Sequence, residues 1–385
     1  MRLLDRYIFA RVLGPVLLLV GGFSAVFILF DMTETAAKLF GEGGGIGVAL
    51  RYYLTQMPYL LMLCLPASIL LGTLYGVGRM SRRNETTSIL TAGVGFFRML
   101  LPVLVLGLIA SLIGMGLSRD WATEFDAQKS KILDQMTGRA RPQLAMNAHL
   151  FRNRQDLRTW FVEELPLEGN RLRGVEITQF REDGTLERKW YAGAATFVPT
   201  TRVWILENAK LLRFRADGVI LEQSLHPEII LNDWTETAWR LVSSAYKARY
   251  LGSTNLERYL SENADFPAPQ LAPFRTYLAY RIAQPWACLV VALIAAPLAV
   301  MQNRRGMFAN LGLALGLFFA YLFLSTIFLA LGEGSRIAPW LAAWGPNLFF
   351  GGIGLLLFWM RSGNRLWSGR NKTDTFYASQ AGAVS

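Results

Sequence analysis

Long apolar stretches lie toward both ends of the chain, and a polar block, residues 121–272, separates them. A membrane-spanning helix needs about 20 mostly apolar residues. Six windows meet this requirement: Val12–Phe30, Leu54–Val77, Met99–Leu117, Ile282–Val300, Phe308–Leu331 and Ile337–Met360. The pattern therefore predicts three membrane helices, a domain in water, and three more membrane helices.

The polar block has the composition and spacing of short β-strands. Runs rich in β-branched and aromatic residues alternate with turn signals at residues 168–170, 182–184 and 216–218. The clearest runs are Thr159–Val162, Gly174–Thr178, Val203–Leu206 and Val219–Leu221. Regularly spaced short strands are typical of a sandwich or jelly roll. The predicted fold class is therefore an α-helical membrane protein with six transmembrane helices (3+3) and an inserted, periplasmic all-β jellyroll-like domain.

Helices are expected on both sides of the strands. Residues Trp121–Gln135 continue the third span, and Thr254 is placed to cap a helix over Leu256–Asn263. A proline-rich linker then returns to the membrane, marked by Pro267, Pro269 and Pro273. The predicted boundaries are 1–118 for the first three helices, 119–273 for the β domain, 274–361 for the last three helices, and 362–385 for a polar cytoplasmic tail.

The basic residues predict the orientation. The short segments on one side of the membrane hold 13 basic and 3 acidic residues, whereas those on the other side hold only Lys38, Arg51 and Arg336 as basic residues. Lys and Arg accumulate in cytoplasmic loops. We therefore expect both termini in the cytoplasm and the large domain on the opposite side.

The net charge of +11 does not indicate nucleic-acid binding. Residues 121–272 hold 20 basic and 20 acidic residues, so the excess belongs to the membrane flanks. No nucleic-acid partner is expected.

No catalytic, cofactor-binding or metal-binding pattern stands out. His149 and His226 are the only histidines, and neither stands at metal-ligand spacing. The glycine-rich run at residues 41–47 lacks the Lys-Ser/Thr of a phosphate-binding loop. Cys64 and Cys288 fall inside predicted spans, where cysteine packs as a small apolar residue. We expect no enzyme site and no cofactor in this chain.

The loop between the second and third spans is more specific. Ser81 or Asn84 is placed to cap a short helix within residues 81–93, and Gly93 is placed to end it. Glu85 and Ile89 would then share one face. Two interpretations stay open: a docking helix for a cytoplasmic partner, or a loop whose arginines follow the inside rule and whose Glu favours a helix N-terminus.

Several segments in chain order resemble one known family. They are Leu4–Ile8, Arg83–Glu85 with Ala92–Val94, Tyr191–Phe197 with Val203–Leu206, Gln284–Pro285, and the ending from Ala338–Pro339 through Gly345–Pro346 to Met360–Arg361. These segments are similar to the LptF/LptG permeases of the lipopolysaccharide-export ABC transporter, and more to LptG than to LptF. The resemblance covers residues 1 to 361.

The resemblance implies a transport machine of several chains in the bacterial inner membrane. A sibling LptF-like permease pairs with the chain, and a dimer of cytoplasmic ATPases (LptB-like) binds ATP and Mg. Lipopolysaccharide is extracted from the membrane and passed to periplasmic bridge proteins (LptC/LptA-like). The chain has no phosphate-binding loop of its own, so hydrolysis belongs to the partner.

The resemblance also implies site residues. The ATPase would contact Glu85, with Ile89, Leu90 and Arg83 beside it. The first and fifth spans would form lateral gates, which makes Phe27, Phe30, Leu322 and Phe323 candidates for lipid contact, together with the outer-domain strand around Trp204. A phosphorylated head group favours nearby cations, so Lys38 and Arg51 are further candidates; the alternative for both is that they extend to ordinary head groups.

Two other classes of function fit the topology. A membrane scaffold without transport activity would need neither Glu85 nor an ATPase. A channel or ion-coupled carrier would need charged side chains inside the spans, and the sequence has none there. The permease interpretation is the one that we carry forward.

Overall fold

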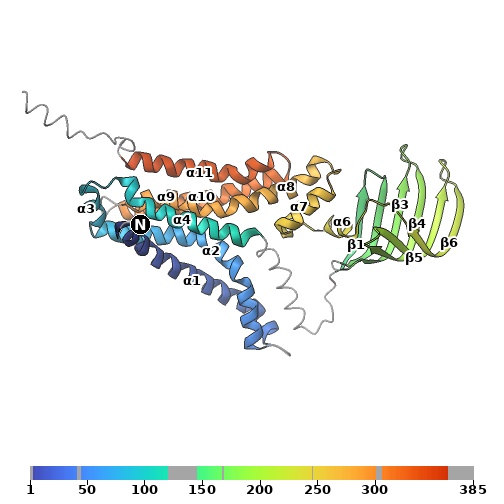
Figure 1. The fold of residues 1–385 in the computed structure, drawn as a ribbon, viewed down its shortest axis with the longest axis horizontal. Coiled ribbons are helices and arrows are strands. Elements are labelled where there is room, and N and C mark those ends of the chain that lie inside the picture. The colour runs from blue at the N-terminus through green and yellow to red at the C-terminus, as the bar shows by residue number, and fades with distance from the viewer. Residues whose placement is uncertain are drawn as a thin grey trace, which may run out of the picture.

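The computed structural model describes residues 3–40, 45–119, 145–166, 169–244, 246–300 and 306–362. A helical half and a β half lie along the long axis (Figure 1). The predicted helix over Trp121–Gln135 and the polar tail lie outside the described residues.

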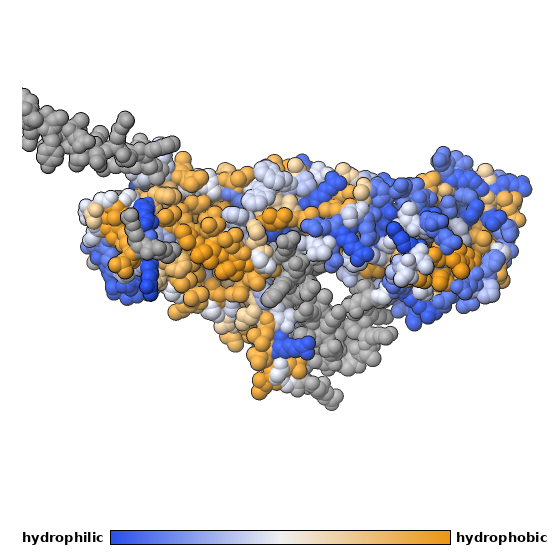
Figure 2. Space-filling model, viewed as in Figure 1, coloured by the Kyte–Doolittle hydropathy of each residue, from blue (hydrophilic) through white to orange (hydrophobic). Residues whose placement is uncertain are grey.

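Among the described residues, six helices are long and apolar enough to cross a membrane, as predicted. Five of them are α1 (Leu3–Leu39), α2 (Ile46–Arg82), α4 (Phe96–Arg119), α10 (Gly306–Glu333) and α11 (Pro339–Arg361). The fourth span consists of α8 (Ala268–Ala283), the short 3₁₀ turn η2 (Gln284–Trp286) and α9 (Ala287–Ala299). Apolar residues cover this half of the surface, whereas hydrophilic residues cover most of the sheet (Figure 2).

The break in the fourth span is stabilised by side chains of two neighbouring helices. Pro285 has no N–H, so the carbonyl of Arg281, four residues earlier, lacks its helical donor. The Ser118 hydroxyl of α4 donates to that carbonyl at 3.0 Å. From α11, the amide of Asn347 donates to the carbonyl of Ala283 at 2.7 Å. The freed backbone groups therefore stay bonded inside the membrane, as a broken span requires.

The first two helices pack closely where the C-terminal part of α2 meets the N-terminal part of α1, because α2 presents glycines there. A Cβ atom on Gly72 would lie 2.4 Å from Val16 Cγ2, and one on Gly76 would lie 2.7 Å from the Arg11 carbonyl oxygen. Small residues permit such close approach in membranes. Ile8 and Val12 of α1 are consequently buried at this contact.

The inserted domain holds one antiparallel sheet of six strands, and the predicted all-β insertion is confirmed. The strands are β1 (Ala145–Asn153), β2 (Arg158–Pro166), β3 (Arg171–Phe180), β4 (Leu186–Val198), β5 (Val203–Phe214) and β6 (Ile220–Leu231). Each pairs with the next in chain order, so the described strands form a meander without crossover connections. The predicted turns at residues 182–184 and 216–218 are present, and Gly184 and Gly218 supply their positive φ angles.

Short helices join the sheet to the membrane. They are α6 (Ala238–Ser244), η1 (Ala248–Tyr250) and α7 (Ser253–Glu262). The predicted helix after Thr254 exists, but its N-cap is Gly252. The predicted proline linker is wrong: Pro267 is the N-cap of α8, and Pro269 and Pro273 lie within that helix. Proline fits the first turn of a helix because its missing N–H is not needed there.

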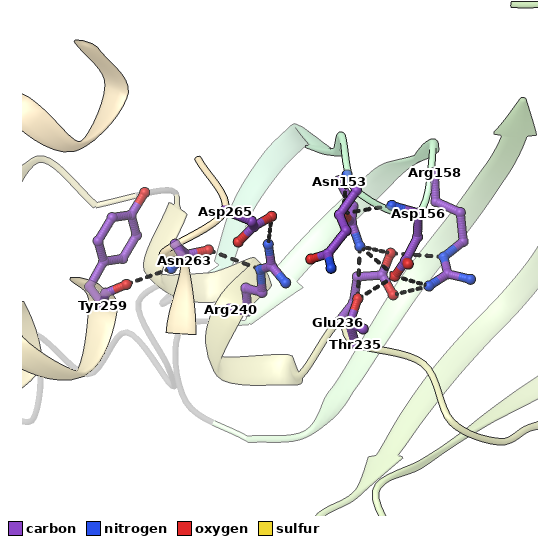
Figure 3. Close-up of polar contacts among 10 residues, drawn as sticks. Asn153, Asp156, Arg158, Thr235, Glu236, Arg240, Tyr259, Asn263 and Asp265 are labelled. Atoms are coloured by element: carbon purple, nitrogen blue, oxygen red, sulfur yellow. Dashed lines mark hydrogen bonds and ion pairs between the residues drawn. The ribbon is translucent and has the colours of Figure 1, made fainter. Parts of the chain in front are cut away.

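Buried ion pairs stabilise the joint between sheet and helices (Figure 3). Arg158 of β2 donates to the fully buried Glu236 before α6 at 2.9 Å. Arg240 of α6 donates to Asn263 at 3.0 Å and also pairs with Asp265. Buried charges need such partners, so these contacts attach the sheet to the segment that enters α8.

Candidate coupling helix and lipid-facing surfaces

The loop between the second and third spans contains the predicted helix, α3 (Glu85–Thr91). It lies at the end of the helical half that is remote from the sheet (Figure 1). Asn84 occupies the N-cap position, as predicted, but its backbone is left-handed and its side chain makes no cap hydrogen bond. Ser81, the alternative cap, belongs to α2.

The C-terminus of α3 ends as the sequence predicts. Gly93 has a φ of +89°, its N–H bonds the Leu90 carbonyl, and the Val94 N–H bonds the Ile89 carbonyl. This pair of bonds is a Schellman motif, in which glycine avoids the steric cost of the left-handed conformation. The motif brings Val94 beside Ile89, and both pack against the transmembrane core.

The four residues predicted to contact the ATPase differ in their surroundings. Arg83 is exposed and Glu85 is half-buried, so both reach the surface. Ile89 and Leu90 instead pack inward against the transmembrane core. These two apolar side chains secure α3 on the membrane domain, because an apolar face close to water is stabilised by burial, and their contact with the ATPase stays a prediction. The exposed face of α3 is polar and consists of Thr87, Ser88 and Thr91.

Glu85 also has a partner that the sequence did not predict. The Tyr7 hydroxyl of α1 donates to Glu85 Oε2 at 2.8 Å. Tyr7 belongs to the N-terminal segment that resembles the family's start. The pairing of residues 78 positions apart needs a tertiary contact, which a single sequence does not reveal.

The first and fifth spans are the least covered of the six. Only 22% of the apolar window of α1 and 17% of that of α10 is buried, against 44% to 72% in the other four spans. Phe30 is 71% exposed on α1, and Phe323 is 70% exposed on α10. Leu322 is also exposed, whereas Phe27 is half-buried.

Arg51 and Lys38 are the two cations predicted to contact lipid phosphates. Arg51 is exposed near the start of α2. The side chain of Lys38 lies outside the described residues.

An apolar cavity of about 730 Å³ lies between α1, α2, α9 and α10. Leu18 of α1, Leu74 of α2, Leu298 of α9 and Leu311 of α10 contribute to its wall, and Arg82 is its charged lining residue. A cavity of this size lies within the range of about 300–1,000 Å³ that is usual for ligand sites.

Trp204, predicted as a lipid contact, lies in the core of the β domain. Its side chain is fully buried, its ring centroid lies 4.9 Å from that of Trp160, and its Nε1 donates to the Glu236 carbonyl at 2.7 Å. This burial does not test lipid contact at the strand around Trp204, which stays a prediction. Residues that alternate along a strand share a face, and Trp204 shares the inner face with Leu206.

Two titratable groups near the joint have shifted pKa values. Burial lowers the pKa of His149, whose Nε2 lies 2.9 Å from the Ser244 hydroxyl. Burial raises the pKa of Tyr259 to about 12, and its ring stacks on Phe274 with centroids 3.8 Å apart. Both groups are thus neutral near pH 7, which suits packing rather than catalysis. Within the described residues, no group of three His, Cys, Asp or Glu side chains is arranged to hold a metal ion.

Comparison with known proteins agrees with this geometry. The sequence model of the family described as "Lipopolysaccharide export system permease LptF/LptG" matches residues 6–360. The lipopolysaccharide export system permease protein LptG of Escherichia coli strain K12 is 26% identical over 216 residues, which are 53% of this chain and 56% of that protein. LptG of Escherichia coli O6:H1 strain CFT073 matches with the same identity and coverage. The chain thus spans about half the length of the curated relatives that it matches.

Proposed function

The chain belongs to the LptF/LptG family of lipopolysaccharide export permeases, and from that premise we propose that it is a permease subunit of an ABC transporter. It is a multi-pass membrane protein, more similar to LptG than to LptF. In this role it extracts lipopolysaccharide from the inner membrane and passes it to a periplasmic bridge of LptC/LptA-like proteins.

The observation that carries the proposal is the uncovered surface of α1 and α10. A glycolipid with several acyl chains enters a helical bundle sideways, between helices whose faces are not filled by the protein itself. The two least buried spans are α1 and α10, and both present large exposed aromatic side chains. These faces are suited to acyl chains and to the matching helices of a sibling LptF-like permease.

The energy source in this proposal is a separate ATPase dimer, which binds ATP and Mg. The polar face of α3 is its docking surface, with Arg83 and Glu85 beside it. Ile89, Leu90 and Val94 anchor the helix from below, so a force applied to α3 reaches the membrane core.

The proposed orientation places α3 and both termini in the cytoplasm and the sheet in the periplasm. Two observations support it: the 13 basic residues of the short segments on one side, and the position of α3 at the end of the molecule opposite the sheet. Thiol labelling in right-side-out vesicles tests it. A cysteine on Leu225 of β6, which is 75% exposed, should react from outside, and Ser88→Cys should not.

Photo-crosslinking in a reconstituted complex tests the proposed function. The complex contains this chain, the sibling permease and the ATPase in vesicles with lipopolysaccharide. Crosslinkers at Phe30 and Phe323 should form lipopolysaccharide adducts, whereas matched crosslinkers at the buried Val20 of α1 and Ala314 of α10 should not. Absence of adducts at every position of both helices in an assembled, ATP-hydrolysing complex would favour the scaffold alternative.

A further inference from the structure

The α3-proximal end of α1 is bonded to the helix that would receive the ATPase. Tyr7 donates to Glu85 of α3 at 2.8 Å, and Asp5 pairs with Arg98 at the start of α4 at 2.9 Å. We propose that Tyr7 is a positioning residue that ties the coupling helix α3 to the gate helix α1. Movement of α3 is thereby transmitted to α1 directly. This inference rests on the proposed function.

The Tyr7 side chain is held from two sides. Its hydroxyl donates to the Glu85 carboxylate and accepts a hydrogen bond from Arg11 Nη2 at 3.0 Å. The Arg11 guanidinium also lies over the Tyr7 ring, 5.0 Å from its centroid. Hydrogen bonds with an ionised partner are stronger than neutral ones. The ring therefore has a defined position between an acid of α3 and a base of its own helix.

Glu85 can serve Tyr7 and a partner protein together. A carboxylate has two oxygens and about four acceptor positions, and Tyr7 bonds only Oε2. Glu85 is half-buried rather than enclosed, so a donor on the ATPase can reach it. The same carboxylate would then join the ATPase on one side to α1 on the other.

The helix that receives this contact is well suited to transmit it. It is helical from Leu3 to Leu39, and Pro15 within it leaves one backbone hydrogen bond unmade between Tyr7 and Phe30. Near Tyr7, the helix is firmly packed: Ile8 is buried in the transmembrane core, and Val12 lies so close to Gly76 of α2 that no room is left for a Cβ atom there. Farther along, Phe30 is exposed. A displacement imposed at Tyr7 is therefore passed along this one helix toward its uncovered part.

The decisive variant is Tyr7→Phe, which removes only the hydroxyl. We expect normal assembly with the ATPase and near-normal ATP hydrolysis, but about a five- to tenfold fall in lipopolysaccharide released per ATP, which corresponds to about 1–1.4 kcal/mol, the loss typical of one hydrogen bond. The matched control is Tyr75→Phe. Tyr75 is exposed on α2 and lines the same small cavity as Glu85, so the control removes a hydroxyl from the same region and should preserve the wild-type ratio.

A second measurement separates positioning from a purely structural role. An environment-sensitive fluorophore on a cysteine at Phe30 should report an ATP-dependent change in the wild-type complex and in Tyr75→Phe. The change should be lost in Tyr7→Phe at unchanged thermal stability. If Tyr7→Phe exports at the wild-type ratio and its α1 still responds to ATP, the positioning role is refuted. Loss of ATPase binding in Tyr7→Phe would also refute it, because Tyr7 would then be a docking residue. If the wild-type complex exports no lipid, the proposed function itself fails.

Discussion

Asn347 allows the most quantitative test of the membrane half. This side chain is buried and makes two hydrogen bonds: it accepts from the Tyr321 hydroxyl of α10 at 2.8 Å and donates to the Ala283 carbonyl at 2.7 Å. Asn347→Leu keeps a similar volume but leaves both partners unpaired. A polar group left unpaired in the interior costs about 1–3 kcal/mol, which gives an upper range of about 2–6 kcal/mol for the two.

Measured hydrogen bonds between membrane helices are weaker, on average about 0.6 kcal/mol. We therefore expect Asn347→Leu to destabilise the protein by about 2–3 kcal/mol, and Tyr321→Phe, which loses only one bond, by about 1 kcal/mol. The double variant leaves only the Ala283 carbonyl unpaired, so its cost should be smaller than the sum of the two single costs.

The assay is unfolding in mixed micelles as the fraction of denaturing detergent rises, followed by tryptophan fluorescence. Thr326→Val serves as a matched control, because it removes a hydroxyl of α10 that bonds its own helix, at the Leu322 carbonyl. Two results would refute the reasoning: a cost below about 0.5 kcal/mol for Asn347→Leu, or strict additivity in the double variant.

Three further predictions concern α3 and the β domain. Gly93→Val should weaken ATPase pull-down, because an L-residue in the left-handed conformation costs about 1–2 kcal/mol. The control Gly95→Val, at a position with no neighbouring atom within 4 Å, should bind normally. Equal binding by both variants would contradict the role of the Schellman motif. Trp204→Ala should destabilise the sheet by about 3–5 kcal/mol, seen as lost hydrogen-exchange protection, while Leu225→Ala on exposed β6 changes little; unchanged protection would mean that Trp204 is not a core residue. Because burial lowers the pKa of His149 from 6.5, the unfolded chain binds a proton more readily than the folded one, so the melting temperature of the β domain should fall as the pH drops below about 6.5. His149→Gln should flatten that dependence, and an unchanged pH profile would exclude His149 as its cause.

Features that depend on local sequence were predictable. The six spans follow from composition alone, since no soluble helix needs such long apolar windows. The C-terminal end of α3 follows from Gly93, because that position favours glycine, whereas Asn84 marks the start of the helix without making the cap hydrogen bond that its residue type predicts. The turns at Gly184 and Gly218 follow because glycine readily adopts the positive φ angles that these turns need.

Features that depend on tertiary contacts were not predictable. Trp204 is an aromatic residue on a predicted strand, and only its burial in the folded domain shows that it faces the core. The contact of Ile89 with the transmembrane core is also tertiary, and the sequence did not predict it. The partners of Glu85 and Asn347 come from helices remote in sequence, and the meander order of the strands depends on which edges meet.

The break in the fourth span forms a bend between α8 and α9, and the position of the far end of α8 depends on the angle of that bend. The helix has 16 residues, or about 24 Å at 1.5 Å per residue. A change of about 10° in the bend at Gln284 would displace its far end by about 4 Å, as follows from that length. That end continues into α7 and the ion pairs of Arg240, so the sheet would move with it. α8 also packs along α10 and α11. A small shift of α10, the fifth span, that changed the bend would therefore produce a larger displacement at the end of α8 nearest the sheet.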